Sequence, residues 1–277
     1  MSERFKAELI YLTPVIGSLA VSILCAILLA TTSGDLIAGV TPFSDEGTGA
    51  LANAVYFVVL VAAGATIIYV LLKRHNRKVI NVIISFAVVT AVFMLSLVYL
   101  FAFFSLFVFP YMDIVVIGVA VCIAALSYYV IFKSKKVIGN VVILFIGGGL
   151  GTFLGAAIPL YSAVLILGFL AVYDVVAVYR GPVGKIAKSG LDQLPGLSVS
   201  FKDLQMGLGD LTFYSMLSGL MLLNFGYVAC FAAIAGILVG CIVSFLMLER
   251  KGMFPGLPFP IMFGLAAGFF GFFVSLL

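Results

Sequence analysis

The sequence predicts an all-α polytopic membrane protein with nine transmembrane helices, a cytoplasmic N-terminus and an external C-terminus. Its composition is 64% hydrophobic and only 9% charged, whereas soluble proteins average about 25% charged residues. Its apolar residues form long runs that short polar segments separate. Transmembrane β-barrels are excluded, because their strands alternate polar and apolar residues over about ten positions.

The apolar runs have the length of membrane-crossing helices. Most hold about 17–25 residues, which as α-helix crosses about 30 Å of hydrocarbon, and the third is long enough to be tilted. The first is too long for a signal-peptide core, so we expect the mature protein to retain it. The nine runs are 9–30, 51–72, 79–104, 112–132, 137–158, 161–180, 207–223, 226–248 and 258–277.

The basic residues predict the orientation. All 15 Lys and Arg precede the first run or lie between runs two and three, four and five, six and seven, or eight and nine. They therefore share one side, which the positive-inside rule makes the cytoplasm. The other side carries Asp35, Asp45, Glu46 and Asp113. Since membrane topology accounts for the positive charge, we expect a lipid bilayer around the chain and no nucleic-acid partner.

The chain divides into three parts around one long cytoplasmic loop. Residues 1–180 form a six-span block, residues 181–206 the loop, and residues 207–277 a three-span block. Small residues recur at four-residue spacing in several runs, as in Gly147 and Gly151, and let helices approach closely. We expect this packing to be intramolecular, with a homo-oligomer as the alternative.

Apart from Asp113 at the edge of the fourth run, two acids lie inside apolar runs, one in each block. Charged residues at membrane depth are costly and usually functional. Asp174 lies about 9 Å along a helix from Arg180, and Asp210 about 10 Å past Asp203 if that stretch is helical. Because consecutive antiparallel spans are usually neighbours, we expect the two carboxyls to meet in the cytoplasmic third of the membrane. Two close carboxyls in a low dielectric tend to share one proton.

A third element is expected at the same depth. The segment FPGLPFP, at 254–260, contains three prolines in six residues and precedes the last apolar run. Prolines predict a break in regular helix, which leaves backbone groups unpaired near the site. Gly207 and Gly209 similarly let the chain or a ligand approach Asp210.

These elements together resemble the presenilin and signal peptide peptidase family of intramembrane aspartyl proteases, in particular the compact microbial presenilin homologues. The resemblance covers nearly the whole chain. Its motifs are Tyr173-Asp174, Gly207-Leu208-Gly209-Asp210 and Pro255-Gly256-Leu257. The family's third motif usually reads Pro-Ala-Leu, so Gly256 is a departure that keeps the local backbone freedom.

The resemblance implies an aspartic-type endopeptidase that cleaves transmembrane segments of other proteins with Asp174 and Asp210. One aspartate is expected to accept a proton from water while the other binds the scissile carbonyl. Tyr173 either takes part in the site or simply packs, since adjacent helical positions point about 100° apart. Tyr179 and Tyr214 are expected as interfacial aromatics.

The expected partners are transmembrane proteins or peptides. No cofactor is expected, because two aspartates that share a proton need none, and no metal is expected, because the sequence has no HExxH motif and no cluster of His, Cys and acidic residues. The absence of large soluble loops favours activity without accessory subunits. The alternative function is a proton- or cation-coupled transporter or channel that uses the same acids as its ion site.

The segment just before the second aspartate has a strand pattern. Apolar and polar side chains alternate along Leu197-Ser198-Val199-Ser200-Phe201, in an otherwise helical sequence. We expect this segment to pair with an unwound substrate by strand addition, with an ordinary connecting loop as the alternative.

Overall fold

The computed structural model describes residues 6–32, 39–74, 77–107, 111–134, 136–180, 196–202 and 204–277. Residues 181–195 of the predicted cytoplasmic loop lie outside the described residues, as do Asp35, His75 and Asp203.

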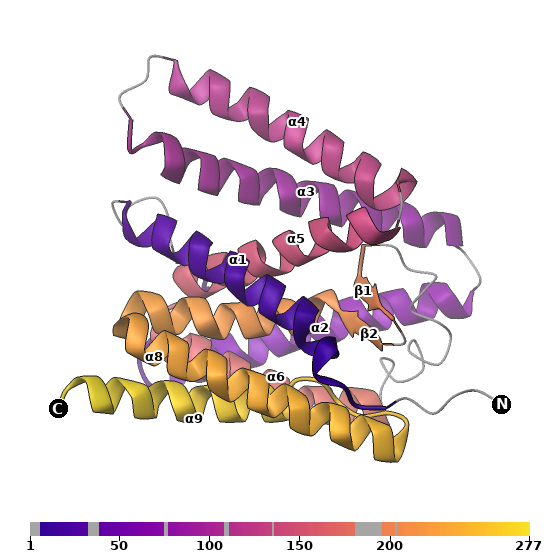
Figure 1. The fold of residues 1–277 in the computed structure, drawn as a ribbon. Helices are drawn as coiled ribbons and strands as arrows, with labels where there is room; N and C mark the ends of the chain where they lie inside the picture. Colours follow the sequence, from indigo (N-terminus) through magenta and orange to yellow (C-terminus); the bar gives the residue numbers. More distant parts are fainter. Residues whose placement is uncertain are drawn as a thin grey trace.

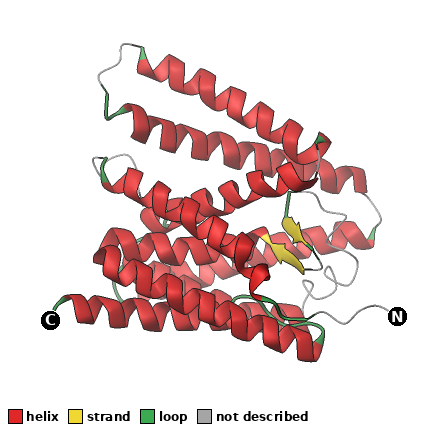
Figure 2. Cartoon of the chain, in the orientation of Figure 1, coloured by secondary structure: helices red, strands yellow, loops and turns green. Residues whose placement is uncertain are grey.

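The described chain is helical apart from one short β-hairpin, as Figures 1 and 2 show. Eight of its helices are long and apolar enough to cross a membrane. They are α1 (Thr13–Ala30, after the 3₁₀ turn η1 at Leu9–Leu12), α2 (Thr48–Lys73), α3 (Arg77–Phe104), α4 (Met112–Lys133), α5 (Lys136–Ala157), α6 (Leu160–Tyr179), α8 (Leu208–Lys251) and α9 (Pro258–Ser275). The predicted all-helical membrane fold is therefore confirmed.

Helix α8 covers two of the predicted apolar runs. Its 44 residues would extend roughly 66 Å if straight, about twice the hydrocarbon thickness. Gly226 interrupts the helix with φ 83° and ψ −171°, a conformation that favours glycine. At this point the chain doubles back (Figure 1), so residues 208–225 form a first arm of α8 and residues 227–251 a second arm.

The glycines at four-residue spacing pack helices of the same chain together. A Cβ on Gly151 of α5 would lie 2.6 Å from Ser215 Cβ on the first arm of α8, and one on Gly155 would lie 2.7 Å from Met216 O. A Cβ on Gly240 in the second arm would lie 2.5 Å from Pro260 Cα on α9. The predicted intramolecular packing is confirmed at these contacts, which hold the first arm closely against α5.

This packing leads to a stability prediction. Gly151→Ala would place a methyl group against Ser215 and the backbone of Met216, and overpacking of this kind costs about 1–3 kcal/mol. We expect a lower Tm in detergent. Gly118→Ala on α4 is the matched control, because its methyl would meet nothing within 4 Å and alanine favours helix. Equal Tm changes in the two variants would contradict the close α5–α8 contact.

A buried hydroxyl cluster joins three helices next to this contact. Thr152 Oγ1 of α5 donates to Ser22 Oγ of α1 at 2.8 Å, and Ser22 Oγ lies 2.8 Å from Ser218 Oγ of α8. With no water at membrane depth, hydroxyls that satisfy one another across helices hold those helices in register.

The predicted strand is present and has a partner that was not predicted. β1 (Ser198–Phe201) pairs antiparallel with β2 (Leu204–Gly207), and Val199 lies opposite Met206. The assumption that 203–210 is helical is therefore wrong over Leu204–Gly207. On the other side of β1, Asn140 Nδ2 of α5 donates to Ser200 O at 2.7 Å and Ser200 N–H donates to Asn140 Oδ1 at 3.4 Å.

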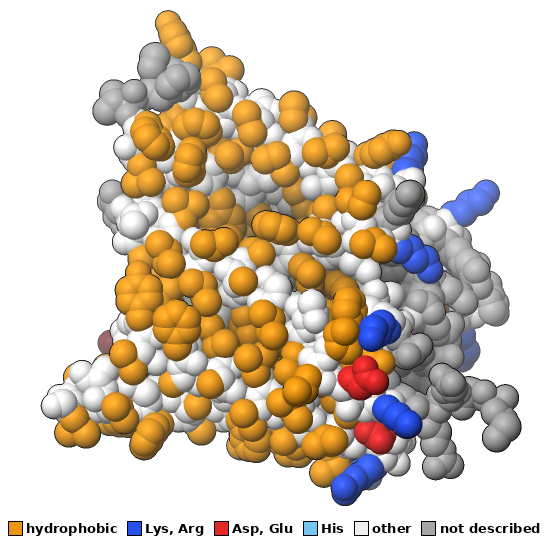
Figure 3. All heavy atoms as spheres, viewed as in Figure 1, with side chains coloured by type: hydrophobic (Ala, Val, Ile, Leu, Met, Phe, Trp, Pro, Cys, Tyr) orange, Lys and Arg blue, Asp and Glu red, His pale blue; other side chains and the backbone are white. Residues whose placement is uncertain are grey.

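Charge is segregated on the surface. In Figure 3 the visible Lys and Arg side chains gather at the end of the molecule where α1 begins, and hydrophobic side chains cover the rest of this face. Helix α9 ends at the opposite end (Figure 1). A belt of apolar side chains with charge at its end is the surface expected of a protein embedded in lipid.

Candidate active site

Asp174 lies near the C-terminal end of α6, which is followed by Arg180. The other end of α6 is fixed by Asp45, whose Oδ1 accepts from the Ser162 N–H at 2.7 Å and whose Oδ2 accepts from the Tyr161 N–H at 3.1 Å. A carboxylate in this position satisfies free N–H groups of the first helical turn. At the site itself, Leu257 N–H donates to Asp174 Oδ2 at 3.0 Å. One oxygen of Asp174 is thereby tied to the Pro-Gly-Leu segment.

Asp210 lies in the first turn of α8, directly after β2. Gly207 ends the strand and is the N-cap residue of the helix. A Cβ on Gly256 would lie 2.9 Å from Asp210 Oδ2, and one on Gly207 would lie 3.6 Å from the same atom. The two glycines therefore allow the backbone to pass close to this carboxyl from two directions.

The Pro-Gly-Leu segment reaches the site because the chain is not helical over 252–257. The break was predicted over 254–260 and is present, but it begins and ends earlier than predicted. Pro258 and Pro260 lie in the first turn of α9. Backbone N–H groups of a first turn have no hydrogen-bond partner within the helix, so proline, which lacks an N–H, is tolerated there. Pro255, Gly256 and Leu257 thus form the end of the break, and Leu257 is the N-cap residue of α9.

Tyr214 is a site residue that the sequence interpretation placed wrongly. It was expected as an interfacial aromatic, but its side chain is buried and its hydroxyl donates to Gly256 O at 2.9 Å. Tyr214 follows Asp210 by four positions, so both side chains lie on one face of α8. That spacing is the signal that could have identified it.

The structure brings some predicted residues together and leaves others apart. Both carboxyls contact the same dipeptide, Asp174 through Leu257 N–H and Asp210 against Gly256. Leu208 instead packs toward α5, with Cδ1 3.4 Å from the Cβ position of Gly147. A Cβ on Gly209 would meet only the ring of Phe213, at 3.9 Å. Tyr173 is partly exposed, beside Asp174 in sequence.

A small cavity of about 90 Å³ lies beside Asp210. The hairpin, both arms of α8 and the 252–257 break contribute its walls. Its lining residues are Leu204, Gln205, Met206, Asp210, Tyr214, Cys241, Ser244, Phe245, Leu248, Phe254, Pro255 and Gly256. A polar cavity next to a carboxyl inside an apolar bundle provides room for water.

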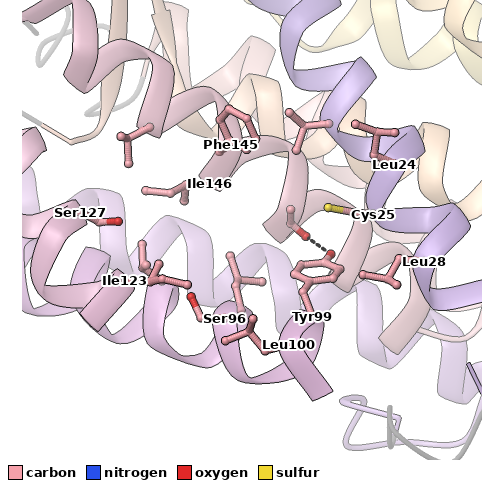
Figure 4. Close-up of a pocket in the computed structure, with 15 residues that line it drawn as sticks. Leu24, Cys25, Leu28, Ser96, Tyr99, Leu100, Ile123, Ser127, Phe145 and Ile146 are labelled. Carbon is pink, nitrogen blue, oxygen red and sulfur yellow. Dashed lines mark hydrogen bonds between the residues drawn. The ribbon is translucent and has the colours of Figure 1, made fainter. Parts of the chain in front are cut away.

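A larger cavity of about 360 Å³ lies elsewhere, between α1, α3, α4 and α5 (Figure 4). Its walls are almost entirely apolar, and Tyr99 donates its hydroxyl to Gly149 O across it at 2.6 Å. None of its lining residues is acidic or basic. Of these two cavities, only the smaller has a carboxyl, that of Asp210, in its lining.

Residues 16–183 match the family model described as "Signal-peptide peptidase, presenilin aspartyl protease". The match covers more than half of the chain and includes Asp174, whereas Asp210 and the Pro-Gly-Leu segment follow it. No curated protein sequence matches the chain.

The fold is similar to two solved structures of a presenilin family intramembrane aspartate protease. The structure in space group C222 has a TM-score of 0.68 and 22% identity, and the match covers 96% of this chain and 99% of that chain. The structure in space group P2 has a TM-score of 0.63 and 20% identity, with 95% and 94% covered. These matches extend the similarity of fold over both aspartates.

Proposed function

Because the chain belongs to the signal-peptide peptidase and presenilin family of aspartyl proteases, and is thus a multi-pass membrane protease, we propose that Asp174 and Asp210 form its catalytic pair. The observation that supports the proposal is that the two carboxyls lie at neighbouring residues: Asp174 accepts from Leu257 N–H, and Asp210 lies against Gly256. The family does not support the alternative of a transporter or channel.

The proposed reaction is hydrolysis of a peptide bond in a transmembrane segment. The ionised aspartate takes a proton from water, whose oxygen forms a bond to the scissile carbonyl carbon. The protonated aspartate hydrogen-bonds the carbonyl oxygen and stabilises the tetrahedral intermediate. The C–N bond then breaks, the amine leaves with a proton, and the second product is a carboxylic acid.

The direct test is incubation of the purified chain alone with a synthetic transmembrane peptide. Mass spectrometry is expected to find paired fragments whose summed mass exceeds that of the substrate by one water. Activity of the purified single chain would also support our proposal that no accessory subunit is required. Intact substrate under conditions where the protein stays folded would contradict the proposal.

The proposed topology has nine crossings, with the N-terminus in the cytoplasm and the C-terminus outside. Its support is the bend at Gly226, which gives α8 two arms of membrane-crossing length, and the gathering of Lys and Arg at one end. In this orientation Asp174 and Asp210 lie near the cytoplasmic surface.

Strand addition remains our proposal for substrate presentation, with the pairing edge moved from 197–201 to β2. Leu208 N–H donates to Leu197 O at 2.8 Å, so the backbone of Leu208 faces β1. Along an antiparallel strand the backbone N–H and C=O groups of successive residues point to alternate sides. Those of Gln205 and Gly207 therefore point away from β1. The outer edge of β1 is already engaged by Asn140. An unwound substrate needs partners for its backbone, since unpaired groups in hydrocarbon cost several kcal/mol each.

Gln205→Pro is expected to impair cleavage of transmembrane peptides by at least about tenfold, because it removes one N–H from the β2 edge. Binding of a small inhibitor directed at the aspartates is expected to be unchanged. Gln205→Ala, which keeps the N–H, is the matched control, and Val199→Pro disrupts the hairpin itself. Equal loss of cleavage and inhibitor binding in Gln205→Pro would contradict the proposed role of this edge.

A further inference from the structure

The second arm of α8 directs one face into the cavity beside Asp210. Four residues of this arm line the cavity, and counted from the first they stand at positions zero, three, four and seven: Cys241, Ser244, Phe245 and Leu248. That spacing describes a single helical face. Across the cavity, the first arm contributes Asp210 together with Tyr214. The sequence interpretation assigned no role to this face.

Ser244 is the unusual member of that face. Its side chain is 6% exposed, and its hydroxyl has no hydrogen-bond partner within the described part of the chain. Helical serines often bond back to a carbonyl of the preceding turn. Ser18 and Ser218 do so here, to Val15 O at 3.0 Å and Ser215 O at 3.1 Å. Ser244 lines the cavity, so its hydroxyl is, among the described residues, an unpaired polar group in the cavity wall.

The other polar groups near the cavity are partly engaged. Tyr214 donates its hydroxyl to Gly256 O, and Leu257 N–H holds Asp174 Oδ2. Asp210 and Ser244 line the same space, together with the apolar side chains of Phe245 and Leu248. A cavity of about 90 Å³ has room for water. A buried water needs two to four polar partners, which a carboxyl and a hydroxyl begin to supply.

We propose that Ser244 is a positioning residue for the hydrolytic water, which its hydroxyl hydrogen-bonds while Asp210 contacts the same water. This inference rests on the proposed function, since it requires the aspartate pair to activate that water. It assigns Ser244 no proton transfer. The hydroxyl limits where the water oxygen lies when it attacks the carbonyl carbon.

The test compares Ser244→Thr with Ser244→Val, which have nearly the same shape and differ by one hydroxyl. We expect the kcat for a transmembrane peptide to be about tenfold lower with valine than with threonine, the effect of one lost hydrogen bond to a reacting group. The KM is expected to be the same in both, because the hydroxyl binds water rather than substrate. Ser244→Ala is expected to lower kcat similarly without lowering Tm.

Other results would overturn the inference. Equal kcat values for threonine and valine, or a defect confined to KM, would remove the water-positioning role. A purely structural Ser244 would give a higher Tm in Ser244→Ala, with kcat unchanged, because removing an unpaired buried hydroxyl stabilises a fold. Ser218→Ala is the control for a bonded serine of α8, and we expect it to lower Tm and leave kcat unchanged.

Asp210→Asn, assayed in the same series, separates this inference from the proposed function. If Asp210→Asn is inactive while the threonine and valine variants are equal, only the Ser244 inference fails. If Asp210→Asn cleaves normally, the proposed catalytic pair fails first.

Discussion

Asp174→Asn and Asp210→Asn are each expected to lower the rate of peptide cleavage by at least about 10⁴-fold, with little change in Tm. The double variant is expected to be no worse than either single one, because groups that act as a unit are not additive. Mass-spectrometric counting of product against time measures the rate. Thermal unfolding of the same preparations measures Tm.

Asparagine separates chemistry from structure at these two positions. It has nearly the shape of aspartate, and at residue 174 its oxygen can still accept from Leu257 N–H. What it lacks is the ability to take or give a proton. Asp113→Asn, in the first turn of α4, is the matched control and is expected to leave the rate unchanged.

The opposite pattern would identify a different role. If the two acids only hold helices together, each substitution would lower Tm while the remaining folded enzyme still cleaved. Substantial cleavage by either single variant would rule out the proposed pair.

The membrane helices could be predicted closely because hydrocarbon thickness sets their length. The predicted run 112–132 compares with α4 at Met112–Lys133, and 161–180 with α6 at Leu160–Tyr179. The two arms of α8 could be predicted as separate runs because Asn224 and Gly226 interrupt the apolar sequence, and the bend occurs at Gly226.

The site was less predictable, because depth along a helix fixes only one of three coordinates. Which way Asp210 points depends on the rotation of α8, and packing against Gly151 and Gly155 of α5 sets that rotation. Gly151 and Gly155 are both far from Asp210 in the sequence. The contact of Gly256 with Asp210 likewise depends on the residue at which α9 starts. The three prolines of 254–260 limit the possible start positions but do not determine which one is used.

β2 was missed for a different reason. Leu204 and Met206 are buried and alternate with Gln205, which is a strand pattern, but it lasts four residues before the helix begins. So short a segment gains its stability from pairing with β1, and the pairing is a tertiary property. The alternation from 197 to 201 was detectable because it is one residue longer and bounded by turn-forming residues.

The N–H of Leu257 is the remaining group whose removal is expected to have a large effect. It donates to Asp174 Oδ2 at 3.0 Å, and hydrogen bonds to carboxylates are worth about 1.5–3 kcal/mol. Leu257→Pro would delete this donor. The backbone tolerates proline there, since φ is −77° at Leu257 and proline prefers about −65°. Gly256, which precedes it, has no Cβ to clash with the proline ring.

Leu257→Pro is therefore expected to lower kcat by roughly 10- to 150-fold through loss of the bond that orients Asp174. Leu257→Ala is the matched variant, because it also removes the buried side chain but keeps the N–H. We expect it to shift the cut site or reduce cleavage less. In both variants the Leu257 carbonyl can still accept from Ile261 N–H, a bond of 3.0 Å at the start of α9, so the helix should begin normally. Equal kcat values for the proline and alanine variants would show that the leucine side chain, and not the N–H, is what the site requires.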